Sequence, residues 1–120
     1  MKRRIYTDEE ISILKKNMFV RSVKYKRELE YDPIFKLWTI MMRLECPELT
    51  AKEIFERGGM NTKILHPTLP RRRINEWLFN YKKFGIKYFI PEDTAYTITD
   101  TFKKQLLDIV KGKLNRYEEN

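Results

Sequence analysis

Apolar residues recur at the spacing of one helix face in five stretches of the chain, and this pattern predicts a mainly α-helical protein. The predicted helices cover residues 8–17, 33–45, 51–57, 70–84 and 100–117. Apolar side chains occupy much of the circumference of the second stretch, so we expect that helix to be central and buried. The fourth stretch has the clearest amphipathic pattern, with apolar positions at Ile74, Trp77, Leu78, Tyr81 and Phe84.

Residues at the ends of these stretches support the predicted boundaries. Thr7 and Thr50 are each followed three positions later by a glutamate, which is the arrangement of a capping box at a helix start. Asp32, a preferred N-cap residue, precedes a proline that suits the first helical turn. Pro70 suits the start of the fourth helix, and Gly85 suits its end.

The chain after Gly85 has a different pattern. Residues 86–90 and 96–99 are rich in β-branched and aromatic side chains, which predicts a small β-hairpin wing over residues 86–99. The helix predicted over 100–117 is amphipathic, and its apolar stripe consists of Phe102, Leu106, Ile109, Val110, Leu114 and Tyr117.

The charge of the chain favours a polyanionic partner. Its 120 residues include 25 Lys and Arg against 17 Asp and Glu, a net charge of +8. The excess lies in residues 1–30 and, more strongly, in residues 60–90, where seven residues are basic and one is acidic. Nucleic acid is the first class of partner that this distribution indicates. The alternative is that these cations are an ordinary solvated surface.

Residue types that commonly carry catalysis or metal binding are scarce. Cys46 is the only cysteine and His66 the only histidine, and together they cannot supply the four soft ligands of a structural zinc site. The chain has neither of the glycine-rich motifs whose loops bind phosphate, Gly-x-x-x-x-Gly-Lys-Ser/Thr and Gly-x-Gly-x-x-Gly. We therefore expect no catalytic residue, no cofactor and no metal, and an enzyme ranks third among the functions considered.

The sequence has no feature typical of secretion or of membranes. Acidic residues follow the basic start where a signal peptide would have an apolar stretch. No run approaches the ~20 apolar residues of a membrane span. We expect a cytoplasmic protein that does not contact a membrane.

A short capped helix, a connection and a longer helix that opens with three arginines follow the order of a helix-turn-helix module. If the apolar side of the 70–84 helix faces the core, its opposite side is free for DNA. Arg and Asn pair bidentately with guanine and adenine, so Arg72 and Asn75 are the predicted base contacts. The full predicted DNA-binding set is Arg71, Arg72, Arg73, Asn75, Glu76, Phe79, Lys82 and Lys83, of which Arg71, Arg73, Lys82 and Lys83 would neutralise phosphates.

Several segments also resemble a known family. They are Tyr6-Thr7-Asp8-Glu9-Glu10-Ile11, Leu49-Thr50-Ala51-Lys52-Glu53-Ile54-Phe55-Glu56-Arg57-Gly58-Gly59, Pro70-Arg71-Arg72, Trp77 and Tyr81-Lys82-Lys83-Phe84-Gly85. Over residues 5–85 the chain resembles the helix-turn-helix module of insertion-sequence transposases. In elements of this family with two reading frames, a small protein from the first frame supplies DNA binding and the second frame supplies the catalytic domain. The resemblance implies recognition of DNA ends or operators by the 70–84 helix, with the 50–57 helix as its partner. The acidic-triad nuclease domain of a transposase has no counterpart here, so transposition chemistry does not carry over.

We therefore expect a helix-turn-helix bundle in two parts. Residues 1–85 would form the DNA-binding domain, and residues 86–120 an extension that packs on it or mediates homodimerisation through the 100–117 helix. The expected function is sequence-specific binding of double-stranded DNA, by a mobile-element protein or a regulator derived from one. The alternative is a mobile-element or phage protein that binds and inhibits a host protein or ribonucleoprotein.

Overall fold

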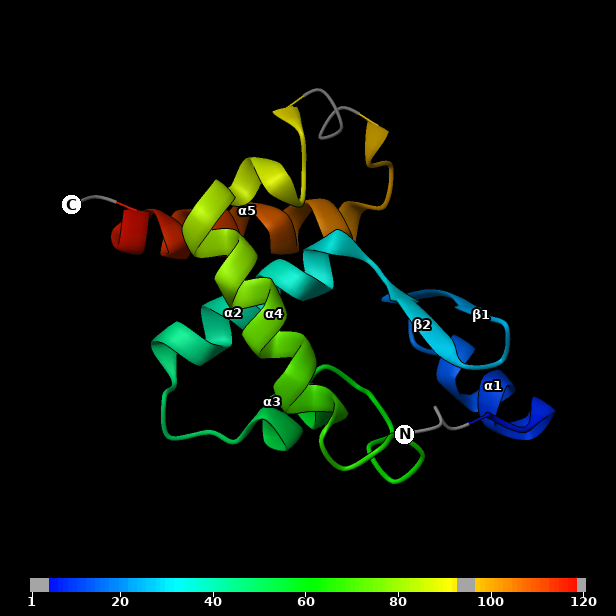
Figure 1. Ribbon diagram of the computed structural model, residues 1–120. Coiled ribbons are helices and arrows are strands. Elements are labelled where there is room, and N and C mark those ends of the chain that lie inside the picture. The colour runs from blue at the N-terminus through cyan, green and yellow to red at the C-terminus, as the bar shows by residue number, and fades with distance from the viewer. Residues whose placement is uncertain (1–4, 93–96, 119–120) are drawn as a thin grey trace.

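The computed structural model describes residues 5–92 and 97–118. Its elements, in chain order, are α1 (Asp8–Lys15), β1 (Val20–Lys24), β2 (Glu28–Tyr31), α2 (Pro33–Glu45), α3 (Ala51–Arg57), α4 (Leu69–Phe84), the 3-10 helix η1 (Ile86–Tyr88) and α5 (Thr101–Glu118) (Figure 1). The predicted fold class is confirmed: the chain is mainly helical, with a small antiparallel hairpin and a C-terminal helix.

The helix starts make the capping contacts that the sequence predicts. The Thr7 hydroxyl accepts a hydrogen bond from the Glu10 amide at 3.1 Å, and Glu10 Oε1 accepts one from the Thr7 amide at 2.9 Å. Thr50 and Glu53 form the same reciprocal pair at the start of α3. The Asp32 side chain caps α2. Because these contacts are local in sequence, the helix boundaries could be predicted closely.

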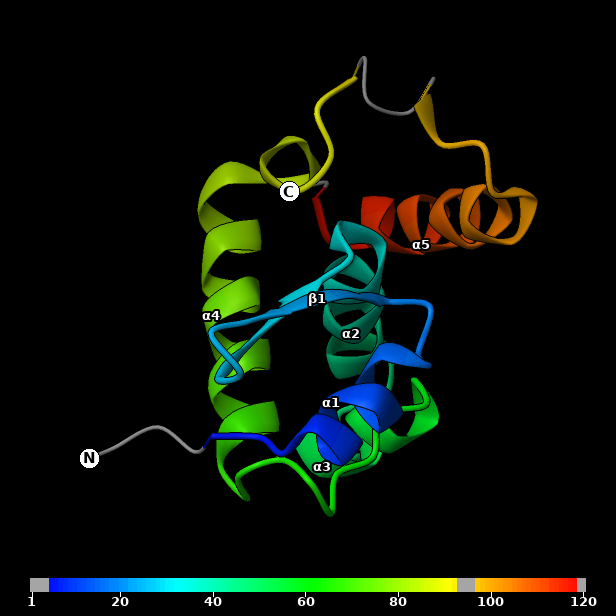
Figure 2. The same cartoon turned by 90° about the vertical axis from the view of Figure 1, so that its right-hand side faces the viewer.

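The central helix of the core is α2. Its residues Phe35, Leu37 and Ile40 have no exposed surface. Both α4 and α5 pack against α2, and α3 packs against α2 and α4 (Figures 1 and 2). Aromatic rings fill the junction: the Phe35 ring centre lies 5.4 Å from that of Phe55 and 6.0 Å from that of Trp77. The apolar side of α4 is thereby anchored in the core.

The hairpin lies elsewhere in the chain than predicted. Residues 86–88 form the η1 turn, so the first strand expected there is wrong, and residues 93–96 lie outside the described residues. Phe89 and Ile90 are neighbours and are both buried, which a strand with one solvated face does not allow. The hairpin instead pairs β1 with β2, from Val20 opposite Tyr31 to Lys24 opposite Glu28.

The C-terminal helix packs back onto α2, which is one of the two arrangements expected for it. Its predicted apolar stripe is partly wrong, because Phe102 and Ile109 are 54% and 56% exposed. Lys103 Nζ lies 2.9 Å from Asp32 Oδ2 at the start of α2, so the side of α5 that carries Lys103 faces inward. The residues of α5 that this orientation buries are Leu107, Val110 and Leu114.

The connection between α3 and α4, residues 58–68, is longer than the three- or four-residue turn of a compact helix-turn-helix. It is nevertheless packed, because Met60, Ile64 and Leu65 are buried. Asn17 Nδ2 also donates a hydrogen bond to its first carbonyl, that of Gly58, at 2.8 Å. Since α3 and α4 contact each other directly, the two helices remain neighbours despite the longer loop.

Candidate nucleic-acid interface

One side of α4 is buried and the opposite side is exposed, as the amphipathic pattern predicts. Ile74, Trp77 and Tyr81 are buried in the core. The predicted contact residues that are exposed are Arg71, Arg72, Asn75, Glu76, Phe79, Lys82 and Lys83. We call the strip formed by Arg72, Asn75, Phe79 and Lys83 the outer face. Phe79 is 64% exposed although its ring has no polar atom, so the outer face combines cations, an amide and an aromatic ring.

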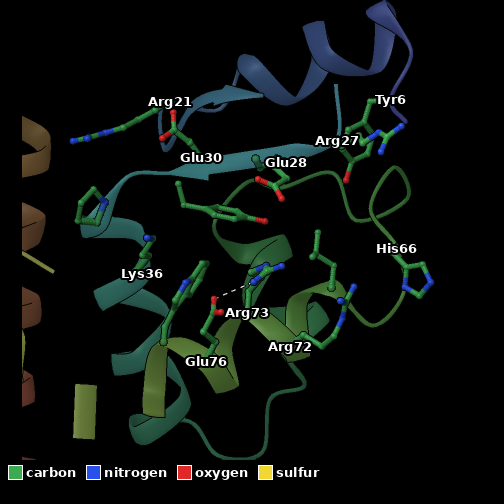
Figure 3. Close-up of a pocket in the computed structure, with 15 residues that line it drawn as sticks. Tyr6, Arg21, Arg27, Glu28, Glu30, Lys36, His66, Arg72, Arg73 and Glu76 are labelled. Atoms are coloured by element: carbon green, nitrogen blue, oxygen red, sulfur yellow. Dashed lines mark hydrogen bonds and ion pairs between the residues drawn. The ribbon is translucent and has the colours of Figure 1, made fainter. Parts of the chain in front are cut away.

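Arg73 differs from the other predicted phosphate contacts. Its side chain is partly buried, and its Nη1 lies 3.0 Å from Glu76 Oε1 (Figure 3). This ion pair offsets part of the arginine charge. Arg73 lines a groove beside α4, as Arg72 of the outer face also does, but Arg73 is less exposed than Arg72 and is paired with a carboxylate.

The first turn of α4 concentrates positive charge. Its N-cap residue Thr68 makes no side-chain capping bond, and the turn contains no acidic residue. His66 Nδ1 instead accepts a hydrogen bond from the Thr68 amide at 3.2 Å, which places the histidine in a capping role. The positive end of the helix dipole therefore adds to the charges of Arg71, Arg72 and Arg73.

A groove of about 640 Å³ separates the N-terminal half of α4 from the hairpin (Figure 3). Arg27 and Arg72 lie toward one end of it, whereas Arg21 and Lys36 lie toward the other. The charged residues that line the groove are Arg21, Arg27, Glu28, Glu30, Lys36, Arg72, Arg73 and Glu76. Because cations outnumber carboxylates in this lining, the groove attracts anions.

Two of the carboxylates in the groove already form ion pairs, Glu30 with Lys24 and Glu76 with Arg73. Glu30 Oε2 lies 3.0 Å from Lys24 Nζ, and hydrogen bonds from Ser22 and Lys24 lower the pKa of Glu30 below its usual value. In the part of the chain that the structure describes, Arg27, Lys36 and Arg72 form no ion pair with a carboxylate.

The Lys36 ammonium has an unusual environment. It lies 5.8 Å from the centre of the Trp77 ring, and partial burial lowers its pKa. Burial penalises the charged form, so an anion bound in the groove would be stabilised by this ammonium more strongly than by one in open water.

Tyr31 connects the hairpin to α4 through the wall of the groove. Its ring is buried, with its centre 5.0 Å from that of Trp77 in an edge-to-face arrangement. Its hydroxyl is buried without a hydrogen-bond partner among the described residues. Burial raises the pKa of this hydroxyl, and the nearby Arg73 charge only partly opposes the rise. The hydroxyl therefore stays protonated at neutral pH.

The C-terminal end of α4 has a cluster of exposed aromatic rings. Phe84 and Tyr88 stack with their ring centres 5.0 Å apart, and both are about half exposed. Lys83 Nζ lies 5.8 Å from the centre of the Phe79 ring and 5.5 Å from that of Phe84. Phe84 was expected on the apolar side of the helix, and this part of the predicted pattern is wrong, because the helix ends there and the Phe84 ring is half exposed beside Lys83.

The sequence reasoning missed the hairpin and its cations. Alternation in Glu28-Leu29-Glu30-Tyr31, with its burial only at the second and fourth positions, could have indicated a strand. The turn itself gave no signal, because Tyr25-Lys26 stands where asparagine and glycine are the usual residues. The sequence therefore shows these cations only as part of the charge excess of residues 1–30, and their place in the wall of a groove is visible only in the structure.

Cys46 and His66 both have local structural roles. Cys46 is half-buried at the C-cap of α2, and its amide donates a hydrogen bond to the Met42 carbonyl.

Across residues 5–92 and 97–118, no group of three or more His, Cys, Asp or Glu is arranged to hold a metal ion. Within the same residues, none of the helices has the length and apolarity needed to span a bilayer.

Comparison of the chain with protein-family profiles, with curated proteins and with solved structures found no match in any of the three.

Proposed function

We propose that this protein binds double-stranded DNA through α4, with the outer face in the major groove and with Arg72 and Asn75 at base edges. The observation that carries the proposal is the outer face itself. Arg72 and Asn75 are exposed on consecutive turns, and the helix that presents them is anchored in the core by Ile74 and Trp77. A rigid helix with free Arg and Asn side chains suits direct readout of bases.

Affinity would come from phosphate contacts within this strip and on both sides of it. Lys83 lies in the strip, Arg71 and Lys82 are exposed beside it on α4, and Arg27 lies across the groove on the hairpin. Each phosphate neutralised releases counterions, so binding would weaken steeply as salt rises. The charge excess of residues 60–90 supports a polyanionic partner.

The resemblance of residues 5–85 to transposase helix-turn-helix modules gives this proposal its biological context. Such a module would read a specific site on a mobile element, or would belong to a regulator derived from one.

Selection of bound fragments from sheared genomic DNA at ~150 mM salt tests the proposal directly, since nonspecific attraction is weak there. We expect enrichment of one short site. Uniform retention, or none, would refute sequence-specific DNA binding.

Two alanine variants then test the assignment of the outer face on the selected site. Arg72→Ala should weaken binding by about 1–3 kcal/mol and relax the sequence preference, whereas Lys82→Ala should weaken all sequences alike and lower the salt slope by about 1. Lys104→Ala, an exposed cation on α5, is the matched control and should bind as the wild type does. Equal sequence preference in Arg72→Ala and wild type would contradict the base contact.

The exposed apolar residues of α5 favour a second candidate, which is binding of a host protein or of a second copy of this chain. Phe102 and Ile109 face away from α2 and are more than half exposed. Sedimentation of the protein alone and with a host lysate, at high salt, tests this candidate. A stable complex that is lost in Phe102→Ala or Ile109→Ala, together with no DNA shift at moderate salt, would favour it over DNA binding.

A further inference from the structure

The tip of the β1–β2 hairpin, residues 24–27, has a backbone that its sequence does not favour. The Arg27 amide donates a hydrogen bond to the Lys24 carbonyl at 2.9 Å and closes a β-turn over residues 24–27. The two central residues, Tyr25 and Lys26, have φ angles of 54° and 56°. Both values lie in the left-handed region, where asparagine and glycine are the residues with least strain. Tyr-Lys is therefore a poor choice for the stability of this turn.

Contacts from outside the turn hold this conformation in place. The Tyr6 amide donates a hydrogen bond to the Lys26 carbonyl at 2.8 Å. Lys26 Nζ also lies 3.1 Å from Asp8 Oδ1, but both side chains are exposed and such a pair adds little stability. The backbone of the tip is thus held mainly by its hydrogen bond to the segment before α1.

The side chain that the strained turn presents is an exposed aromatic ring. Tyr25 is 85% exposed, the most among the exposed large hydrophobic residues of the described chain. Its neighbours Lys24, Lys26 and Arg27 are all exposed cations. A rigid turn that holds an aromatic ring in water among three cations gains nothing for folding. Backbone strain of this kind is commonly found at binding sites.

The position of the hairpin selects the partner. Arg27, next to the strained pair, lines the groove whose opposite wall includes Arg72 of the outer face (Figure 3). Arg27 of the tip and Arg72 of the outer face therefore lie on opposite walls of one groove, in whose lining cations outnumber carboxylates. A double helix bound on α4 would present further phosphates and sugars beside the groove, and their charge complements that of the tip.

We propose that the hairpin tip is a second DNA contact of this protein, in which the Tyr25 ring packs on the DNA and Lys24, Lys26 and Arg27 lie at the flanking phosphates. The inference rests on the proposed function. Tyr25 supplies apolar contact area at the tip, and α4 reads the bases.

Replacement of Tyr25 by asparagine separates binding from folding. Asparagine tolerates the left-handed region, so Tyr25→Asn should unfold at the same temperature as wild type or a few degrees higher. Loss of the ring should weaken binding of the selected duplex on the order of tenfold, with the salt slope unchanged. Tyr25→Phe keeps the ring and should bind nearly as tightly as wild type. Ile13→Ala removes an exposed apolar side chain from α1 and should leave DNA affinity unchanged.

Two outcomes distinguish failure of the inference from failure of the proposed function. If wild type binds the duplex and Arg72→Ala weakens it, but Tyr25→Asn binds as wild type does, the tip is not a DNA contact. If wild type binds no duplex at moderate salt, DNA binding itself is wrong and the inference falls with it. A Tyr25→Asn variant that loses both affinity and thermal stability would also overturn the inference, since the ring would then support the fold.

Discussion

Asp32 should contribute more to stability than any exposed acid, because it joins three elements at one buried point. Its Oδ1 accepts a hydrogen bond from the Ile34 amide at 2.9 Å and caps α2. Its Oδ2 lies 2.9 Å from Lys103 Nζ on α5 and 3.9 Å from Arg21 Nε on β1. The side chain of Asp32 is 5% exposed, against 21% for Lys103 and 61% for Arg21. The ion pair with Lys103 is therefore mostly shielded, and the one with Arg21 is mostly screened by water.

These exposures set the expected size of each substitution. Breaking a fully buried ion pair costs about 3–5 kcal/mol and breaking an exposed one about 0–1 kcal/mol. Lys103 can reach water when its partner is lost, so Asp32→Asn, which keeps the cap, should cost about 1–2 kcal/mol. Asp32→Ala also removes the cap and should cost about 1 kcal/mol more.

Urea unfolding at neutral pH, followed by circular dichroism, measures these differences. A difference of about 1 kcal/mol corresponds to a midpoint shift of roughly 0.5–1 M urea for a small domain. Glu92→Ala is the control, because the Lys87–Glu92 pair at 3.3 Å is exposed at both ends and should contribute almost nothing. If Asp32→Asn shifts the midpoint no more than Glu92→Ala, the buried pair does not stabilise the fold. If Asp32→Ala and Asp32→Asn are equal, the cap contributes nothing.

Three further substitutions test the packing and the contact between α2 and α5. Gly58→Ala should destabilise the protein by about 1–3 kcal/mol, because the new Cβ would lie 2.5 Å from Cε1 of Phe35. In Gly112→Ala the new Cβ meets no atom within 4 Å, so this variant should stabilise α5 by up to about 1 kcal/mol. Thermal unfolding of both variants checks these opposite signs. Tyr117→Phe removes a hydrogen bond to the Glu45 carboxylate, which is the largest cause of the lowered pKa of Glu45. A carboxyl group whose pKa is lower in the folded protein stabilises the fold at pH values above its unfolded pKa of 4.5, and this stabilisation is lost as the pH falls below 4.5. Tyr117→Phe should therefore destabilise the protein more at pH 7 than at pH 3. A difference from wild type that is the same at both pH values would contradict the linkage.

The helices could be predicted from sequence because their signals are local. Each of these signals acts within one helical turn. The structure contains the capping boxes at Thr7 and Thr50, and it contains the Asp32 cap followed by a proline in the first turn of α2. The hairpin could not be predicted in the same way, because its turn is held by distant contacts such as that from the Tyr6 amide. The orientation of α5 likewise depends on Lys103 meeting Asp32, a contact that the local pattern does not encode.

The candidate site likewise has one part that could be predicted from local sequence and one part that could not. Exposure of Arg72 and Asn75 follows from the period of one helix, so the outer face could be predicted from α4 alone. The groove is formed by the hairpin and α4, which lie far apart in the sequence, and the periodicity of either segment does not indicate that they are close in space. Arg73 shows the consequence: it falls beside the outer face in sequence, yet it pairs with Glu76 and lines the groove.

The core ties the two proposed DNA-contacting elements to each other. Tyr31 ends the hairpin and Trp77 lies in the middle of α4, and their buried rings contact at 5.0 Å. The Phe35 ring of α2 lies 5.8 Å from Tyr31 and 6.0 Å from Trp77, so all three elements share one aromatic cluster. Because interiors are close-packed, the hairpin and α4 cannot move independently without opening this cluster. DNA that contacts both would therefore meet a surface already in its binding geometry, and little ordering entropy would be lost on association.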